Sequence, residues 1–209
     1  MRARPISAII GGLAVTVFVA SACTSTGGNP SPATTSSTGA ITSTSVASSS
    51  TGSDSSSVAP RVAHPLDASK MAATPCLALT ATDLAGLQVM NPINGGANQT
   101  ASGIQCTWTG SPGGSVGVAW ETASISGLSD LYAKQSAIAY WQPTTVSGYP
   151  AAYGDAISDG RSQGDCVINV GVTDHMYFFV NFNNPVNAGA SCTLAAQAAT
   201  DVIRNLGGS

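Results

Sequence analysis

Few side chains in this sequence of 209 residues could act as an acid or a base in catalysis. The chain has only two histidines, His64 and His175, and His175 directly follows Asp174. A serine hydrolase needs a histidine that carries a proton between the serine and the leaving group. His175 falls in an expected tight turn, where polar residues are common for backbone reasons. We therefore expect neither a catalytic triad nor a Gly-x-Ser-x-Gly nucleophile elbow, and we assign no catalytic residue.

The carboxylates offer little more for catalysis or for metal binding. A glycosidase needs two carboxylates that face one cleft, and Glu121 is the only glutamate. Asp155, Asp159 and Asp165 are close in sequence and could form a loose Ca²⁺ site, although their spacing does not match an EF-hand loop. Solvated loop charges are the simpler interpretation. We expect no metal and no cofactor.

Four of the five cysteines lie in the C-terminal two-thirds of the chain, namely Cys76, Cys106, Cys166 and Cys192. Four thiols allow three pairings, between which the sequence alone does not decide. Proximity in the chain favours Cys76 with Cys106 and Cys166 with Cys192. The close Cys-x-x-Cys pairs of a zinc ribbon are missing. We expect two disulfides, which form in oxidising compartments outside the cytoplasm, rather than a zinc site.

The fifth cysteine, Cys23, ends a segment with the features of a secretory signal. Arg2 and Arg4 supply positive charge, and residues 9–20 form an uncharged, apolar run. That run is shorter than the ~20 residues needed to span a bilayer. Residues 19–23, Val-Ala-Ser-Ala-Cys, resemble a bacterial lipobox, which implies cleavage before Cys23 and its modification by fatty acyl chains such as palmitate. An ordinary secretory signal is the alternative, but it would leave an odd number of cysteines to pair.

Composition divides the chain into three parts. We assign residues 1–22 to a lipoprotein signal peptide, residues 23–75 to the lipidated cysteine and a tether, and residues 76–209 to a single domain. Up to about residue 60 the tether is almost entirely Ser, Thr, Gly, Ala and Pro. Such a segment cannot bury enough apolar surface to offset its conformational entropy, so we expect it to be disordered. It acts as a spacer, with O-glycosylation as an optional addition.

The charge of the domain argues against some partners. Charged residues make up 8% of the sequence, and three basic residues face eight acidic ones in residues 76–209. A nucleic-acid binder needs a basic face to neutralise phosphates. We therefore expect no nucleic-acid partner, and we expect the membrane to be reached through the lipid rather than through charge.

Apolar periodicity predicts an α+β domain with a mostly antiparallel sheet and three helices. The expected order is α-β-β-α-β-β-β-β-α. The three helices are expected at residues 79–87, 128–139 and 191–206. The six strands are expected at residues 104–109, 115–121, 143–147, 151–157, 166–172 and 176–182.

Several short motifs recur in the order seen in a known group of proteins. They are Cys76-Leu77-Ala78-Leu79-Thr80, Cys106-Thr107-Trp108, Gly148-Tyr149-Pro150-Ala151, Cys166 and Cys192-Thr193-Leu194-Ala195. Together with the lipobox and the tether, they resemble the actinobacterial surface lipoproteins of the LprB-like type, whose common domain has no assigned function. The resemblance covers residues 76–206. It implies an extracytoplasmic lipoprotein with two disulfides and transfers no catalytic residue.

These observations favour a non-enzymatic binding, sensing or scaffolding module held on the outer face of the cytoplasmic membrane. Tyr140, Trp141, Tyr149 and Tyr153 lie at an expected helix exit and turn, where burial is harder. They could line an exposed patch for a glycan, lipid or protein partner of the cell envelope, or simply close the core beneath the turn. A carrier of lipid or of another small ligand is the alternative function, and an envelope hydrolase is the weaker one.

Overall fold

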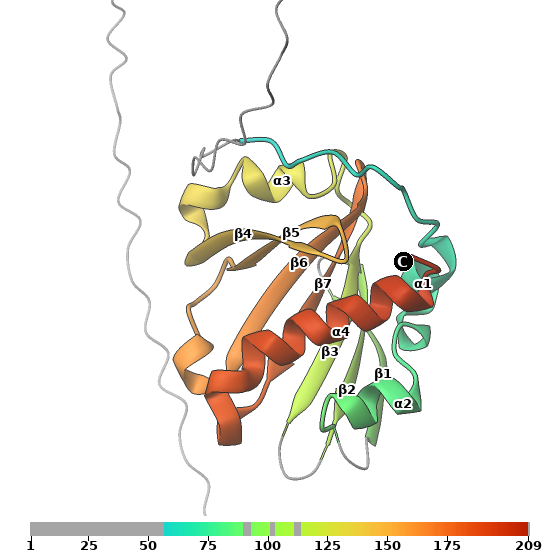
Figure 1. Cartoon of the computed structure of the whole chain (residues 1–209), viewed down its shortest axis with the longest axis vertical. Coiled ribbons are helices and arrows are strands. Elements are labelled where there is room, and N and C mark those ends of the chain that lie inside the picture. The colour runs from blue at the N-terminus through green and yellow to red at the C-terminus, as the bar shows by residue number, and fades with distance from the viewer. Residues whose placement is uncertain (1–56, 90–92, 101–102, 111–113, 209) are drawn as a thin grey trace, which may run out of the picture. The chain divides into compact units, whose positions relative to one another are not determined.

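Seven strands form one sheet in which every neighbouring pair is antiparallel. The strand order is β1-β2-β3-β7-β6-β5-β4 in the computed structural model, which describes residues 57–89, 93–100, 103–110 and 114–208 (Figure 1). The expected signal peptide, Cys23 and residues 24–56 lie outside the described residues. The strands are β1 Ile93–Thr100, β2 Gly103–Thr109, β3 Ser115–Glu121, β4 Tyr140–Val146, β5 Tyr149–Asp155, β6 Asp165–Thr173 and β7 Met176–Asn183.

The main core lies between one face of the sheet and the helices α2 (Ala81–Gly86) and α4 (Ser191–Asn205). Figure 1 shows α4 crossing the central strands on this face, and α4 contacts both β6 and β7. Val116, Val118 and Trp120 alternate along β3, and all three are fully buried in the main core. Each lies opposite an apolar residue of β7, in the pairs Val116–Phe182, Val118–Val180 and Trp120–Phe178.

Thr80 is the N-cap residue of α2. Its hydroxyl accepts a hydrogen bond from the Asp83 amide, and the Asp83 carboxylate accepts one from the Thr80 amide in return. This capping box satisfies backbone donors that the first helical turn leaves unpaired.

The hairpin of β4 and β5 turns one residue earlier than expected. Val146 pairs with Tyr149, so the connection consists of Ser147 and Gly148, with φ values of 48° and 81°. Two left-handed residues make a type I′ turn, whose twist matches that of the flanking strands. Ser147 accepts this conformation although it is not a glycine.

The opposite face of the sheet carries a smaller apolar cluster under α3 (Ser129–Tyr132). Leu128 and Tyr132 pack against Tyr177 of β7, and the rings of Tyr132 and Trp141 meet edge to face with centroids 5.0 Å apart. The helix expected at residues 128–139 is therefore shorter. It ends after one turn and is followed by a short 3₁₀ segment, Gln135–Ala137.

The structure adds two elements that periodicity does not reveal, β1 and the short helix α1 (Ser69–Ala73). Residues 57–75, which composition assigned to the disordered tether, lie against the domain, and this correction moves the start of the packed chain ahead of Cys76. Val62 is 8% exposed and Ala68 is 3% exposed, and both belong to the main core. We call residues 57–75 the strap. In Figure 1 it runs from beside α3 to α1 across one end of the sheet.

Both expected disulfides are formed. Cys76, in the 3₁₀ segment Pro75–Leu77, is bonded to Cys106 of β2. Cys166 of β6 is bonded to Cys192 in the first turn of α4. Each bridge therefore fastens a helical element of the covering layer to a strand of the sheet.

Candidate functional site

The four aromatic residues predicted to share a surface do not come together. Tyr140 and Tyr149 are buried, at 7% and 6% exposure. Tyr153 faces the main core under α4, whereas Trp141 packs with Tyr132 on the opposite face of the sheet. The alternation of β4 and β5 causes this separation, because neighbouring residues of a strand point to opposite faces. These four side chains do not form one continuous patch.

Tyr140 has a structural partner in place of a ligand. Its hydroxyl accepts a hydrogen bond from the Val167 amide at 2.9 Å and faces the Val167 carbonyl oxygen at 3.4 Å. The pairing of β5 with β6 covers Ile168–Val170, so Val167 lies just beyond it. The phenol thus fills the place of the missing strand partner. Burial raises the pKa of Tyr140, which keeps the hydroxyl protonated.

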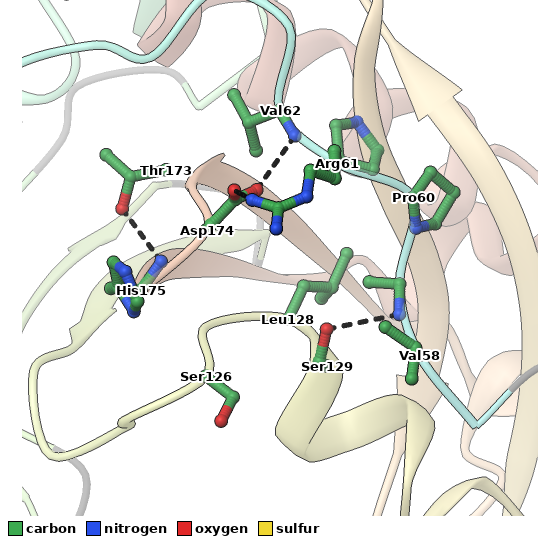
Figure 2. A pocket seen from close by; sticks show the side chains of 12 residues that line it. Val58, Pro60, Arg61, Val62, Ser126, Leu128, Ser129, Thr173, Asp174 and His175 are labelled. Atoms are coloured by element: carbon green, nitrogen blue, oxygen red, sulfur yellow. Dashed lines mark hydrogen bonds and ion pairs between the residues drawn. The ribbon is translucent and has the colours of Figure 1, made fainter.

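A hollow lies between the strap, the loop before α3 and the turn between β6 and β7 (Figure 2). We call it the strap pocket, and its volume is about 420 Å³. Its walls include apolar residues of the strap together with Leu128 and Pro150. Its polar side chains are Arg61, Ser126, Ser129, Thr173, Asp174 and His175. A mixed lining of this kind, with a few convergent polar groups, is typical of sites for small ligands or side chains.

Asp174 fastens the strap at this pocket. One carboxylate oxygen accepts a hydrogen bond from the Val62 amide at 3.0 Å, and the other forms an ion pair with Arg61 (Figure 2). The hydrogen bond from the Val62 amide, followed by that from Arg61, lowers the pKa of Asp174 in spite of some desolvation. The carboxylate is therefore ionised at neutral pH and engaged by the strap.

His175 is oriented by a backbone carbonyl and not by a carboxylate. Its Nδ1 lies 2.8 Å from the carbonyl oxygen of Ile125. A carbonyl can only accept, so Nδ1 carries a proton, and in the neutral tautomer this leaves the lone pair on Nε2. Neither Asp174 oxygen is bonded to the imidazole in the described structure.

Two segments do have the letters Gly-x-Ser-x-Gly, contrary to the sequence expectation. They are residues 113–117 and residues 160–164. Ser115 begins β3, and Ser162 lies in the 3₁₀ segment Arg161–Gln163 before β6. Neither serine occupies the strand-to-helix turn that a nucleophile elbow requires.

Both of these serines also lie far from the histidines. Ser115 pairs with Asn183 at the end of β7, and Ser162 lies just before Asp165, which pairs with the same Asn183. His175 precedes Met176 at the start of β7. The length of β7 separates these positions by roughly 23 Å, at about 3.3 Å per residue. His64 lies on the strap, near the His175 end of the sheet. A serine–histidine contact is therefore not assembled at either motif.

The acidic residues near β6 are occupied by protein groups. Asp159 is bonded to Arg161 through two nitrogen atoms, and Asp155 accepts the Ile157 amide. Burial raises the pKa of Asp165, which accepts a hydrogen bond from Asn181. Within residues 57–208, leaving out the three undescribed gaps, no three His, Cys, Asp or Glu side chains are grouped to hold a metal ion.

The fold and its bridges define the class of protein. It is a disulfide-bonded α+β domain with an open antiparallel sheet, and two disulfides indicate an extracytoplasmic location. No helix in the described part of the chain is long and apolar enough to cross a membrane. The chain belongs to the family described as "Protein of unknown function (DUF3558)", which it matches over residues 18–205. It matches no curated protein and no solved structure.

The strap pocket could not be found from the sequence. Its residues come from three separate stretches, 58–62, 126–129 and 173–175, with Pro150 from a fourth. The available signal was the apolar Val62 and Leu66 in a segment otherwise read as tether. That signal is too short to distinguish a packed strap from a spacer.

Proposed function

We propose that this chain is a lipoprotein, anchored through acylated Cys23 to the outer face of the cytoplasmic membrane, whose domain is a non-enzymatic binding module of the cell envelope. Its resemblance to the actinobacterial LprB-like lipoproteins supports this proposal. So do the lipobox at residues 19–23 and the four cysteines that pair with each other and leave Cys23 over. Several acyl chains on one cysteine would anchor the protein stably.

The strap pocket is the observation that carries the binding role. It combines apolar walls with hydroxyl groups, and Arg61 and Asp174 neutralise each other there. A neutral group with a hydrogen-bond donor, such as a sugar hydroxyl or a peptide amide, would suit the lone pair of His175 Nε2. Because the engaged Asp174 does not orient His175, binding is favoured over hydrolysis.

A carrier of whole lipids is the second candidate, and the packing of the main core weighs against it. Trp120, Phe178 and Phe182 fill the space between the sheet and α4 at 0–1% exposure. The pockets found on the described domain have volumes of 330–460 Å³, near the lower end for ligand sites. These open hollows suit a headgroup, a sugar or a peptide segment better than a complete lipid.

Two measurements on intact cells test the proposal. Cys23→Ala should abolish incorporation of labelled fatty acid into the protein, whereas the neighbouring Ser25→Ala should leave it unchanged. Surface cross-linking should capture a partner, and His175→Ala should reduce the captured amount at least fivefold. His64→Ala is the matched control, because His64 is exposed and does not line the strap pocket.

Each outcome has a clear reading. Fatty-acid labelling of the Cys23→Ala protein at the wild-type level would refute the lipid anchor at Cys23. Equal capture by the His175→Ala and wild-type proteins would refute the assignment of the pocket. Release of a product from envelope polymers by the purified protein would establish an enzyme instead.

A further inference from the structure

Hydrogen bonds and one exposed ion pair attach the strap to the loop before β7, to β6 and to α3. The Ala59 amide donates to the Ser129 hydroxyl at 3.2 Å, and the Leu66 amide donates to the Val172 carbonyl at 3.0 Å. Between these points Asp174 receives the Val62 amide and Arg61. The Arg61 side chain is 88% exposed, so water competes with this ion pair.

The apolar contacts of the strap are also limited. Val62, Ala68 and Pro75 are its buried apolar members, and Leu66, Met71 and Ala72 are partly buried. The helix α1 has no buried residue at all. Segments with little buried apolar surface and exposed hydrogen bonds open at lower free energy than the core to which they are attached.

The attachment changes abruptly at Cys76. Its disulfide to Cys106 fastens the chain to β2, inside the sheet. Cys106 is fully buried and pairs with Val118 of β3. The strap can therefore separate from the domain as far as Pro75, but separation beyond Cys76 requires the disulfide to break or the sheet to open.

We propose that the strap is a load-releasable extension of the tether, held by Asp174 and limited by the Cys76–Cys106 disulfide. This inference rests on the proposed anchor, since an anchor ahead of residue 57 directs any pull on the domain through the strap. Release adds 19 residues to the tether, a reach of at most about 65 Å at 3.3–3.6 Å per residue. The sheet and α4 stay folded while the tether lengthens.

Release also dismantles the strap pocket. Residues 58–62 form one wall of it, and Asp174 loses both of its strap partners when they leave. A bound partner that contacts the strap would hold it closed, because a ligand stabilises the state that it binds. Tension on the tether and occupancy of the pocket would then oppose each other.

Single-molecule pulling tests the device directly. The chain from residue 23 to residue 209, carrying Cys23→Ser, is held at its N-terminus and at a reactive residue placed at the exposed position Thr193. This second handle adjoins Cys192, whose disulfide transmits load to β6 and leaves the rest of α4 unloaded. We expect a first, reversible, low-force step with a contour gain of no more than about 65 Å.

Three variants identify the parts of the device. Asp174→Ala should lower the force of the first step, whereas Asp159→Ala, which breaks an exposed ion pair elsewhere, should not. Replacement of both Cys76 and Cys106 by serine removes the disulfide that limits extension of the strap. The contour gain of the first step should then exceed about 65 Å.

A first step that involves the whole domain, or a step insensitive to Asp174→Ala, would overturn the proposal. An unchanged step length in the double serine variant would overturn the role of the disulfide. The chain used carries no acyl group, so this test and that of the lipid anchor fail separately.

Discussion

Asp83 of α2 and Asp201 of α4 bind the same guanidinium group, that of Arg204. Arg204 Nη2 lies 2.6 Å from Asp83 Oδ1, and Nη1 lies 2.7 Å from Asp201 Oδ1. Asp83 also accepts hydrogen bonds from the Thr80 amide and the Asn205 side chain. This cluster ties the start of α2 to the end of α4 and closes one end of the core.

The two carboxyl groups respond oppositely to this shared partner. Burial opposes ionisation of Asp83, but hydrogen bonds from Thr80 and Asn205 and the charge of Arg204 outweigh it and lower the pKa. Burial raises the pKa of Asp201, and its bond to Arg204 does not compensate. Ionised Asp83 therefore stabilises the fold, and ionised Asp201 weakens it.

A pair of isosteric substitutions tests this difference. Asp83→Asn should lower the free energy of unfolding at pH 7 by about 1–3 kcal/mol, since it leaves donors in the cap poorly matched. Asp201→Asn should leave stability unchanged or slightly increased, because it removes a buried charge. Urea unfolding of both variants measures the change in the free energy of unfolding. Equal losses of stability in the two variants would show that the two carboxylates contribute equally to the fold.

The pH dependence of stability follows from the same shifts. The folded-state pKa of Asp83 lies below its ordinary value of 3.8, so its contribution is present above that value and is lost as the pH falls through the lower one. Asp201 has a raised folded-state pKa, so stability from its protonation is lost as the pH rises through that value. Urea midpoints between pH 2 and pH 7 should show a shallower acid loss for Asp83→Asn. If Asp83→Asn loses stability at low pH as steeply as the wild-type protein, Asp83 is not the group responsible for that loss.

The phenol of Tyr140 provides another test of local structure. Tyr140→Phe leaves the amide and carbonyl of Val167 without their side-chain partner, so the free energy of unfolding should fall by about 1–2 kcal/mol. Tyr132→Phe is the control. The Tyr132 ring contributes by packing on Trp141, so loss of its hydroxyl should lower the free energy of unfolding by less. Equal effects of the two changes would assign the Tyr140 contribution to its ring alone.

The disulfides allow a prediction from loop length. The cysteines of the two bridges are separated by 30 and 26 residues. In the chain-entropy account, each bridge stabilises the fold by about 3–4 kcal/mol, and the two should differ little. Paired serine substitutions followed by denaturant unfolding measure each value. An unchanged free energy of unfolding after removal of either pair would show that the disulfide does not reduce the conformational entropy of the unfolded chain.

The central hairpin was predictable because large apolar residues alternate along both of its strands. Ile168, Val170 and Val172 alternate along β6, and β6 and β7 were found within one residue of their expected bounds. Proximity in the chain also favoured the observed pairing of cysteines, since the two helical elements that carry Cys76 and Cys192 fold onto nearby strands. Short sequence distances and strong periodicity determine both features.

The edge of the sheet and the strap were not predictable for the opposite reason. Strand β1 reads Ile-Asn-Gly-Gly-Ala-Asn-Gln-Thr and has no apolar alternation, so its pairing with β2 defines it. The strap depends on Asp174, more than a hundred residues away in the chain. The prediction of an aromatic patch was wrong because strand alternation places Trp141 and Tyr153 on opposite faces of the sheet.

The most direct test of the account is the mass of the mature N-terminus purified from membranes. We predict that the first residue is Cys23, that it carries fatty acyl chains, and that the other four cysteines resist alkylation until they are reduced. A mature chain that begins elsewhere, lacks acyl groups and is recovered from the medium, or one whose four cysteines react freely, would contradict a lipid-anchored, disulfide-bonded domain outside the cell.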